Sequence, residues 1–196
     1  MDITIRKLTP DLAFDYALFF DTTPHYEQGN QAAVPCYCVT WRNDDSYDDQ
    51  NSHWYETREQ RRERAIWFVQ HGIIQGYLAY LGNRIIGWCS ATGDCHKGVE
   101  FMRLYCPIAE RGPDTKVKSV FCFVVAPEFR RQGIATMLLE YVLRDAADDG
   151  FDYVEAYPLV SSTELDHMGP LAMYLQCGFE VYEDIEERVS VRKALS

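Results

Sequence analysis

The stretch between residues 118 and 149 changes its hydrophobic period midway, and this change constrains the fold more than any other feature of the chain. Val120 to Val125 is a short, mostly β-branched and aromatic run, which is typical of a strand buried on both faces. Pro127 ends this strand because proline cannot donate a hydrogen bond to a sheet. From Gly133 the apolar residues follow the spacing of one helix face, and Gly150 stops the helix. The stretch therefore predicts a buried strand, a tight turn and a long amphipathic helix.

The junction between this strand and this helix is suited to binding phosphate groups. The first turn of a helix leaves backbone N–H groups without intrahelical acceptors, and the positive end of the helix dipole lies there too. Gly133 and Ala135 are small enough to let oxygen atoms approach the backbone, and Arg130 and Arg131 add positive charge. The sequence thus predicts a diphosphate site, the alternative being an ordinary strand-to-helix turn with surface arginines.

The residues around this junction resemble a known motif. The segment that runs from Val125-Ala126-Pro127-Glu128-Phe129 through Arg130-x-x-Gly133-x-Ala135 is similar to the acyl-CoA pyrophosphate loop of the GCN5-related N-acetyltransferase (GNAT) superfamily. A second match lies at residues 169–179, which resemble the family's late helix. The tyrosine of that helix, here Tyr174, is followed by the Gly178-Phe179 pair that opens a strand. The resemblance covers about residues 76–191.

The resemblance implies a fold, a reaction and a set of cofactor contacts. The implied fold is mixed α/β, with a splayed, mostly antiparallel central sheet flanked by helices. The implied reaction moves an acetyl group from acetyl-CoA directly to a primary amine, with no covalent acyl-enzyme and no metal. The residues that it assigns to acetyl-CoA lie along the buried strand and around the turn: Phe123, Val124, Val125, Arg130, Arg131, Gln132, Gly133, Ile134, Ala135 and Thr136.

The resemblance also assigns a catalytic acid but no base. Tyr174 matches the tyrosine that protonates the sulfur of the departing CoA, and a phenol with a pKa near ~10 suits a thiolate; the alternative is a tyrosine packed under the sheet. Some family members use a glutamate on the central strand, but residues 117–126 contain no carboxylate. The general base is therefore left open among a chain of water molecules and four side chains: Asp94, His96, Glu100 and Glu155.

The rest of the chain fits one domain of 196 residues. The resemblance divides it into a variable acceptor-side part, residues 1–75, and a part that binds CoA and carries the chemistry, residues 76–196. Hydrophobic patterns and turn signals predict further elements: a strand at 3–7, helices at 12–20 and 52–70, a hairpin at 76–81 and 84–90, a short strand near 102–105, a strand at 152–157 parallel to the buried one, a helix at 170–177, and a closing hairpin at 179–184 and 187–191.

The charge and the early aromatic residues bear on the acceptor. A net charge of −11 disfavours nucleic acid as a partner, because binding phosphates requires clustered lysine and arginine. It suits an amine drawn to an acidic cleft, such as one near the acidic residues 44–49, although it also has a simpler explanation in solubility. Five side chains line either an acceptor site or the core: Tyr37, Trp41, His53, Trp54 and Tyr55.

Seven cysteines in a chain with no secretion signal are expected to be reduced thiols. Neither Cys36-x-Cys38 nor Cys95-His96 has the spacing of a structural zinc site, and Cys122 on the buried strand is expected to be a core thiol rather than an acyl carrier. With no apolar run long enough to span a membrane, we expect a cytoplasmic monomer or homodimer.

Two other functions are alternatives to an acetyltransferase. A non-catalytic acyl-CoA-binding sensor or partner module would keep the loop at 130–136 but would not need Tyr174. A nucleotide-binding α/β protein is disfavoured because the sequence has neither the dinucleotide-binding nor the P-loop glycine pattern.

Overall fold

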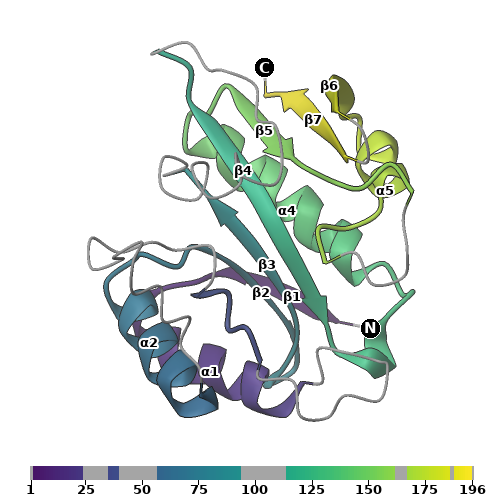
Figure 1. Cartoon of the computed structure of the whole chain (residues 1–196). Helices are drawn as coiled ribbons and strands as arrows, with labels where there is room; N and C mark the ends of the chain where they lie inside the picture. Colours follow the sequence, from purple (N-terminus) through teal and green to yellow (C-terminus); the bar gives the residue numbers. More distant parts are fainter. Residues whose placement is uncertain are drawn as a thin grey trace.

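The computed structural model describes residues 2–23, 35–39, 57–93, 114–161, 167–185 and 188–195. Within these residues seven strands form one open sheet in the order β1-β2-β3-β4-β5-β7-β6 (Figure 1). Neighbouring strands are antiparallel except β4 and β5, which are parallel. This is the mixed, mostly antiparallel sheet expected from the sequence. The strands are β1 (Ile3–Lys7), β2 (Gly76–Leu81), β3 (Arg84–Thr92), β4 (Val117–Val125), β5 (Tyr153–Ala156), β6 (Glu180–Ile185) and β7 (Arg188–Ala194).

Helices cover both faces of the sheet (Figure 1). One face packs against α1 and α2, and the other packs against α4 and α5. The alternation of side chains in β2 shows the two faces directly: Leu78 and Tyr80 lie in the core with α1 and α2, whereas Tyr77 and Ala79 lie in the core with α4. The helices are α1 (Ala13–Thr22), α2 (Arg58–Gln70), α4 (Ile134–Asp148) and α5 (Leu171–Gln176), with 3-10 turns η1 (Pro10–Leu12) and η3 (Pro127–Phe129).

Strand β4 carries an irregularity that the sequence pattern does not reveal. Its pairing with β3 jumps from Val120↔Ala91 to Cys122↔Ser90, so Phe121 is an extra residue in the ladder. The extra residue shifts the alternation by one position. Val120 lies in the core with α4 before it, and Phe123 does so after it.

Strands β4 and β5 part after four paired residues. The parallel pairing runs from Val117↔Tyr153 to Val120↔Ala156, where β5 ends, while β4 continues to Val125. We call the opening between β4 and the chain after β5 the splay. It confirms the splayed sheet expected from the sequence. Within the described ranges, one edge of the second half of β4 has no neighbouring strand.

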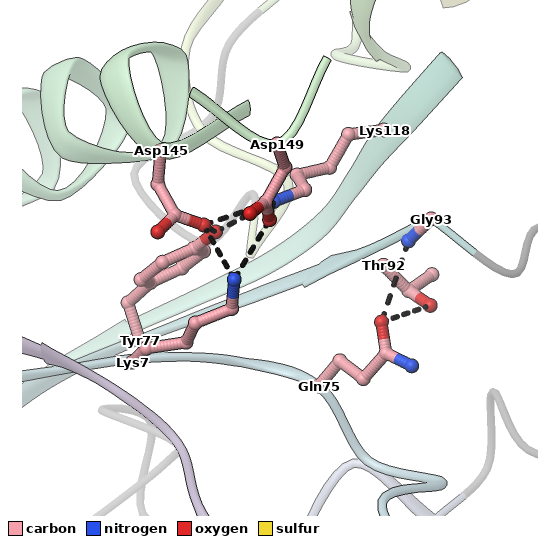
Figure 2. A network of polar contacts seen from close by, with 8 residues as sticks. All are labelled: Lys7, Gln75, Tyr77, Thr92, Gly93, Lys118, Asp145 and Asp149. Carbon is pink, nitrogen blue, oxygen red and sulfur yellow. Dashed lines mark hydrogen bonds and ion pairs between the residues drawn. The ribbon is translucent and has the colours of Figure 1, made fainter. Parts of the chain in front are cut away.

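A polar network fixes the C-terminal end of α4 to the sheet (Figure 2). The Asp145 carboxylate accepts hydrogen bonds from Tyr77 and, at 3.1 Å, from the Lys118 ammonium group, which also lies 3.3 Å from Asp149. Lys7 on β1 bridges the same two aspartates at 3.0 and 2.7 Å. Partial burial would raise the pKa of Asp145, but the hydrogen bonds from Tyr77, Lys7 and Lys118 outweigh it and hold that pKa at about 2.

Most elements begin and end close to the predicted residues, with a few differences. Helix α2 begins at Arg58, where Thr57 and Gln60 form a capping box, rather than at residue 52. Thr9, a residue type that is expected to cap a helix, precedes η1 but makes no side-chain capping hydrogen bond. Several predicted features lie outside the described residues: the strand near 102–105, the acidic residues 44–49, and Trp41, His53, Trp54 and Tyr55. In the ranges that are described, no helix has the length and apolarity needed to cross a bilayer.

Candidate functional site

The second half of β4 presents backbone groups to the splay. The Ala126 N–H donates to Ile86 on β3 at 2.9 Å, so the alternate residues, Phe123 and Val125, point their backbone groups the other way. Two contacts confirm this direction. The Phe123 N–H donates to the His167 carbonyl at 2.6 Å, and the Val125 carbonyl accepts from Nε of Arg130 at 3.0 Å. The structure thus places predicted residues 123 and 125 at the splay, while the Val124 side chain lies in the core with α1 and α2.

The turn after β4 is held by contacts among its own residues. Arg130 reaches back to Val125, and the Gln132 side-chain amide donates to the Glu128 carbonyl at 2.8 Å. Arg131, at φ +60°, and Gly133, at φ +83°, both adopt left-handed backbone conformations that reverse the chain into α4. Glu128 pairs with Arg84 on β3, so the turn is also tied to the sheet.

The N-terminus of α4 is an uncapped helix end that follows this turn. Gly133 occupies the N-cap position and has no side chain to accept a hydrogen bond. The Met137 N–H donates to the Gly133 carbonyl at 2.9 Å, so the N–H groups of Ile134, Ala135 and Thr136 precede the first intrahelical bond. Among the described residues, no atom outside the adjoining chain lies within 4 Å of the position that a Cβ on Gly133 would take. The arrangement can receive an anion on the backbone, as predicted for residues 133–136.

A glycine on β3 sets how closely α4 approaches the sheet. A Cβ on Gly87 would lie 3.0 Å from Cγ2 of Ile134 and 3.3 Å from a methyl group of Leu138. The first turn of α4 therefore rests on β3 at a point where any side chain would push it away. In the sequence, the only signal for this role of Gly87 is that it is a glycine inside a predicted strand.

Tyr174 lies beside Phe123. Its ring centroid is 6.5 Å from that of Phe123 and 5.2 Å from that of Phe179. The side chain is fully buried, and its hydroxyl donates to the Met168 carbonyl at 2.6 Å. The predicted acid and the predicted backbone site are therefore brought together, with the hydroxyl engaged in a hydrogen bond to the chain itself.

Glu155 is the one candidate base within the described residues, and its carboxylate is already in use. One oxygen accepts from Nε and Nη2 of Arg192 at 2.9 and 2.7 Å, and the other accepts from the Tyr157 hydroxyl at 2.8 Å. The side chain is fully buried between β5 and β7. Such a pair holds two strands together, and its burial and the ion pair with Arg192 disfavour a role as a base that meets an amine. Asp94, His96 and Glu100 lie outside the described residues.

The thiols on and near β4 belong to the core. Cys38, Cys89 and Cys122 are buried, as expected for Cys122. A hydrogen bond with Cys122, together with burial, raises the pKa of Cys38, and burial raises that of Cys89, so neither favours the reactive thiolate. Among the residues that the structure describes, no group of three histidine, cysteine or carboxylate side chains is arranged to hold a metal ion.

Comparisons with known proteins find one family and several similar folds. The Acetyltransferase (GNAT) family model matches residues 37–179. No curated protein matches the sequence closely.

Three solved structures resemble the whole chain. The paiA N-acetyltransferase from Thermoplasma acidophilum, in complex with coenzyme A, has a TM-score of 0.53 and 14% identity over 99% of both chains. The protein yncA from Salmonella typhimurium, solved with its cofactor acetyl-CoA, has a TM-score of 0.55 and 14% identity over 99% of this chain and 94% of that one. Ribosomal-protein-S5-alanine acetyltransferase from Vibrio fischeri has a TM-score of 0.58 and 14% identity over 100% of this chain and 94% of that one. At these identities the likeness establishes the fold.

Proposed function

Because this chain belongs to the acetyltransferase (GNAT) family, we propose that it moves an acetyl group from acetyl-CoA directly to a primary amine of an acceptor. One observation carries the proposal. The splay-facing backbone of β4 is followed, within one short turn, by the uncapped N-terminus of α4. A ligand with an extended amide-bearing arm and a diphosphate matches both parts at once.

The proposed acetyl-CoA contacts run from the N-terminus of α4 to the backbone of β4 at the splay. The diphosphate would accept hydrogen bonds from the backbone between Gln132 and Thr136, where the helix dipole favours negative charge. Arg130 is held against the Val125 carbonyl and Arg131 is exposed, so both arginines add positive charge near the turn. The pantetheine arm would run along residues 123–125.

The chemistry assigns three tasks. A backbone N–H at the splay would polarise the thioester carbonyl, which gains negative charge as the amine attacks. Tyr174 would protonate the sulfur that leaves, because it lies beside Phe123 at the same opening. The Glu155 contacts argue against that carboxylate as the base, which favours a water chain or one of Asp94, His96 and Glu100.

We propose that the chain is a single domain and a cytoplasmic monomer or homodimer, with residues 1–75 on the acceptor side. The acceptor is proposed only as an amine. One similar structure is a ribosomal-protein-alanine acetyltransferase by name, and the net charge of −11 suits a basic acceptor, small or peptidic.

The second candidate is a non-catalytic acyl-CoA-binding module. The buried Tyr174 hydroxyl favours it, because a hydroxyl bonded to the Met168 carbonyl is not poised to protonate a ligand.

Calorimetry with acetyl-CoA, followed by a free-thiol release assay, separates these functions. The acceptor panel would hold polyamines, amino acids, aminoglycosides and lysine-containing peptides. Binding with acceptor-dependent thiol release supports the transferase. Binding without release across the panel favours the module, and the absence of binding contradicts both.

A further inference from the structure

Two hydrogen-bond donors at the splay are satisfied by consecutive carbonyl groups of one segment. The Phe123 N–H donates to the His167 carbonyl at 2.6 Å. The Tyr174 hydroxyl donates to the Met168 carbonyl, also at 2.6 Å. Residues 167–169, which we call the strap, therefore lie in the splay and connect Phe123 on β4 to Tyr174 on α5.

The strap is packed in place rather than resting on the surface. Met168 and Gly169 are buried, and Nη1 of Arg188 on β7 contacts both the Met168 sulfur at 3.1 Å and the Tyr157 carbonyl at 3.0 Å. Gly169 has φ +83°, and a Cβ there would lie 2.9 Å from Cε of Met173 and 3.3 Å from the Phe123 ring. This placement thus depends on a glycine, for both backbone conformation and space.

The two donors held by the strap are those that the proposed reaction would use. The thioester carbonyl would need a backbone N–H of β4, and the CoA sulfur would need the Tyr174 hydroxyl. The Tyr174 hydroxyl has a single proton to donate, and the Phe123 N–H already makes a short bond, so strap and acyl group compete for the same positions.

We propose that the strap fills the acyl site when acetyl-CoA is absent and leaves it when acetyl-CoA binds, an inference that rests on the proposed function. In effect, the His167 carbonyl occupies the place of the thioester carbonyl. Because only molecules with an open strap can bind, the apparent affinity for acetyl-CoA equals the intrinsic affinity multiplied by the fraction of molecules that are open. Weakening the closed strap must therefore strengthen binding, whereas weakening a fixed wall of the site would weaken it.

Gly169→Ala tests whether weakening the closed strap strengthens or weakens acetyl-CoA binding. An L-residue at φ +83° destabilises the closed strap, and we expect acetyl-CoA to bind about five- to tenfold more tightly by calorimetry. The nucleotide end of CoA, 3′-phospho-ADP, reaches the turn at 130–136 but not Phe123, so its affinity should not change. Gly82→Ala is the matched control, because Gly82 has φ +59° in the β2–β3 turn with open space around it.

The outcomes separate the strap from the proposed function. Tighter acetyl-CoA binding with unchanged 3′-phospho-ADP binding supports the strap. Equal or weaker acetyl-CoA binding by a folded Gly169→Ala variant, or equal gains for both ligands, overturns the strap and leaves the proposed function standing. If neither the natural protein nor the variant binds acetyl-CoA, the proposed function fails and the strap fails with it.

A second variant covers the case in which Gly169→Ala does not fold. Arg188→Met keeps an apolar stem but removes the donor that links Met168 to Tyr157. It should also tighten acetyl-CoA binding, by about threefold for a lost hydrogen bond of ordinary strength, without changing 3′-phospho-ADP binding. Unchanged or weaker acetyl-CoA binding by this variant contradicts the strap as well.

Discussion

Gly87 on β3 and Ile134 in the first turn of α4 are in such close contact that a Cβ on the glycine would lie 3.0 Å from Cγ2 of the isoleucine. The contact fixes the end of α4 whose backbone N–H groups we assign to the diphosphate. The position of that end relative to β4 therefore depends on the absence of one side chain.

Graded substitution of Gly87 tests this dependence. Gly87→Ala requires a shift of a few tenths of an ångström, whereas Gly87→Val overpacks the contact and should destabilise the fold by about 1–3 kcal/mol. Because the helix end must move, we expect acetyl-CoA affinity to fall slightly in Gly87→Ala and further in Gly87→Val. Urea unfolding and calorimetry measure the two effects, and a stable valine variant with full affinity would contradict the assignment.

Gly133→Val tests the diphosphate site itself. The left-handed backbone at φ +83° disfavours valine by about 1–2 kcal/mol, and the side chain would enter the open space where the diphosphate is placed. We expect acetyl-CoA affinity to fall at least about tenfold while the fold persists. Gly150→Val is the control, since Gly150 has φ +73° and open surroundings at the other end of α4. Equal affinity in both variants would remove the loop from the site.

Tyr174→Phe separates catalysis from packing. Removing the hydroxyl leaves the Met168 carbonyl without its donor and should lower the free energy of unfolding by about 1 kcal/mol. If Tyr174 is the acid, turnover in the thiol release assay should fall by about a hundredfold.

The matched control for that substitution is Tyr16→Phe. The Tyr16 hydroxyl is also buried and donates to a backbone carbonyl, that of Tyr37 at 2.9 Å, on the other face of the sheet. It should show the same loss of stability with normal turnover. Full activity of Tyr174→Phe would mean that the sulfur is protonated from elsewhere.

The ionised Asp145 carboxylate makes the free energy of unfolding depend on pH in the acid range. Its pKa is held at about 2, below the ordinary value of 3.8, so the folded state prefers the ionised carboxylate. The stabilisation is fully present above about pH 4 and is lost as the pH falls through about 2. The side chain is 20% exposed, and after an allowance for solvent screening the effect is about 1–2 kcal/mol.

Asp145→Asn checks this prediction. The variant should be less stable than the natural protein at neutral pH, and its unfolding free energy should change less between pH 4 and pH 2. Asp148→Asn serves as the control because Asp148 is exposed on the same helix, outside the network of Figure 2. A parallel pH dependence in all three proteins would show that Asp145 does not carry the effect.

The sequence predicts most of this fold because its signals are local. The period change after Pro127 and the helix stop at Gly150 depend only on neighbouring residues, and α4 and β4 lie where they predict. The turn signal at Gly82 and Asn83 likewise places the β2–β3 hairpin.

The details of the candidate site could not be predicted in this way, because they arise from contacts between distant segments. The extra residue at Phe121 is set by the register against β3, and nothing in the composition of β4 marks it. The His167 and Met168 carbonyl contacts belong to the backbone, so no side-chain type signals them. The sequence marks Gly169 only as part of a motif and does not reveal the positive φ that requires a glycine there.

The extra residue in β4 has a practical consequence for redesign. It divides the strand into two halves. In the first half the even-numbered residues, Lys118 and Val120, face α4, and in the second half the odd-numbered residues, Phe123 and Val125, do so. A library aimed at longer or bulkier acyl chains should therefore vary positions 123 and 125 and leave 122 and 124 alone. Deleting Phe121 would restore the regular pairing of β4 with β3 and leave both sets on their present faces, whereas inserting or deleting one residue after position 122 would exchange them.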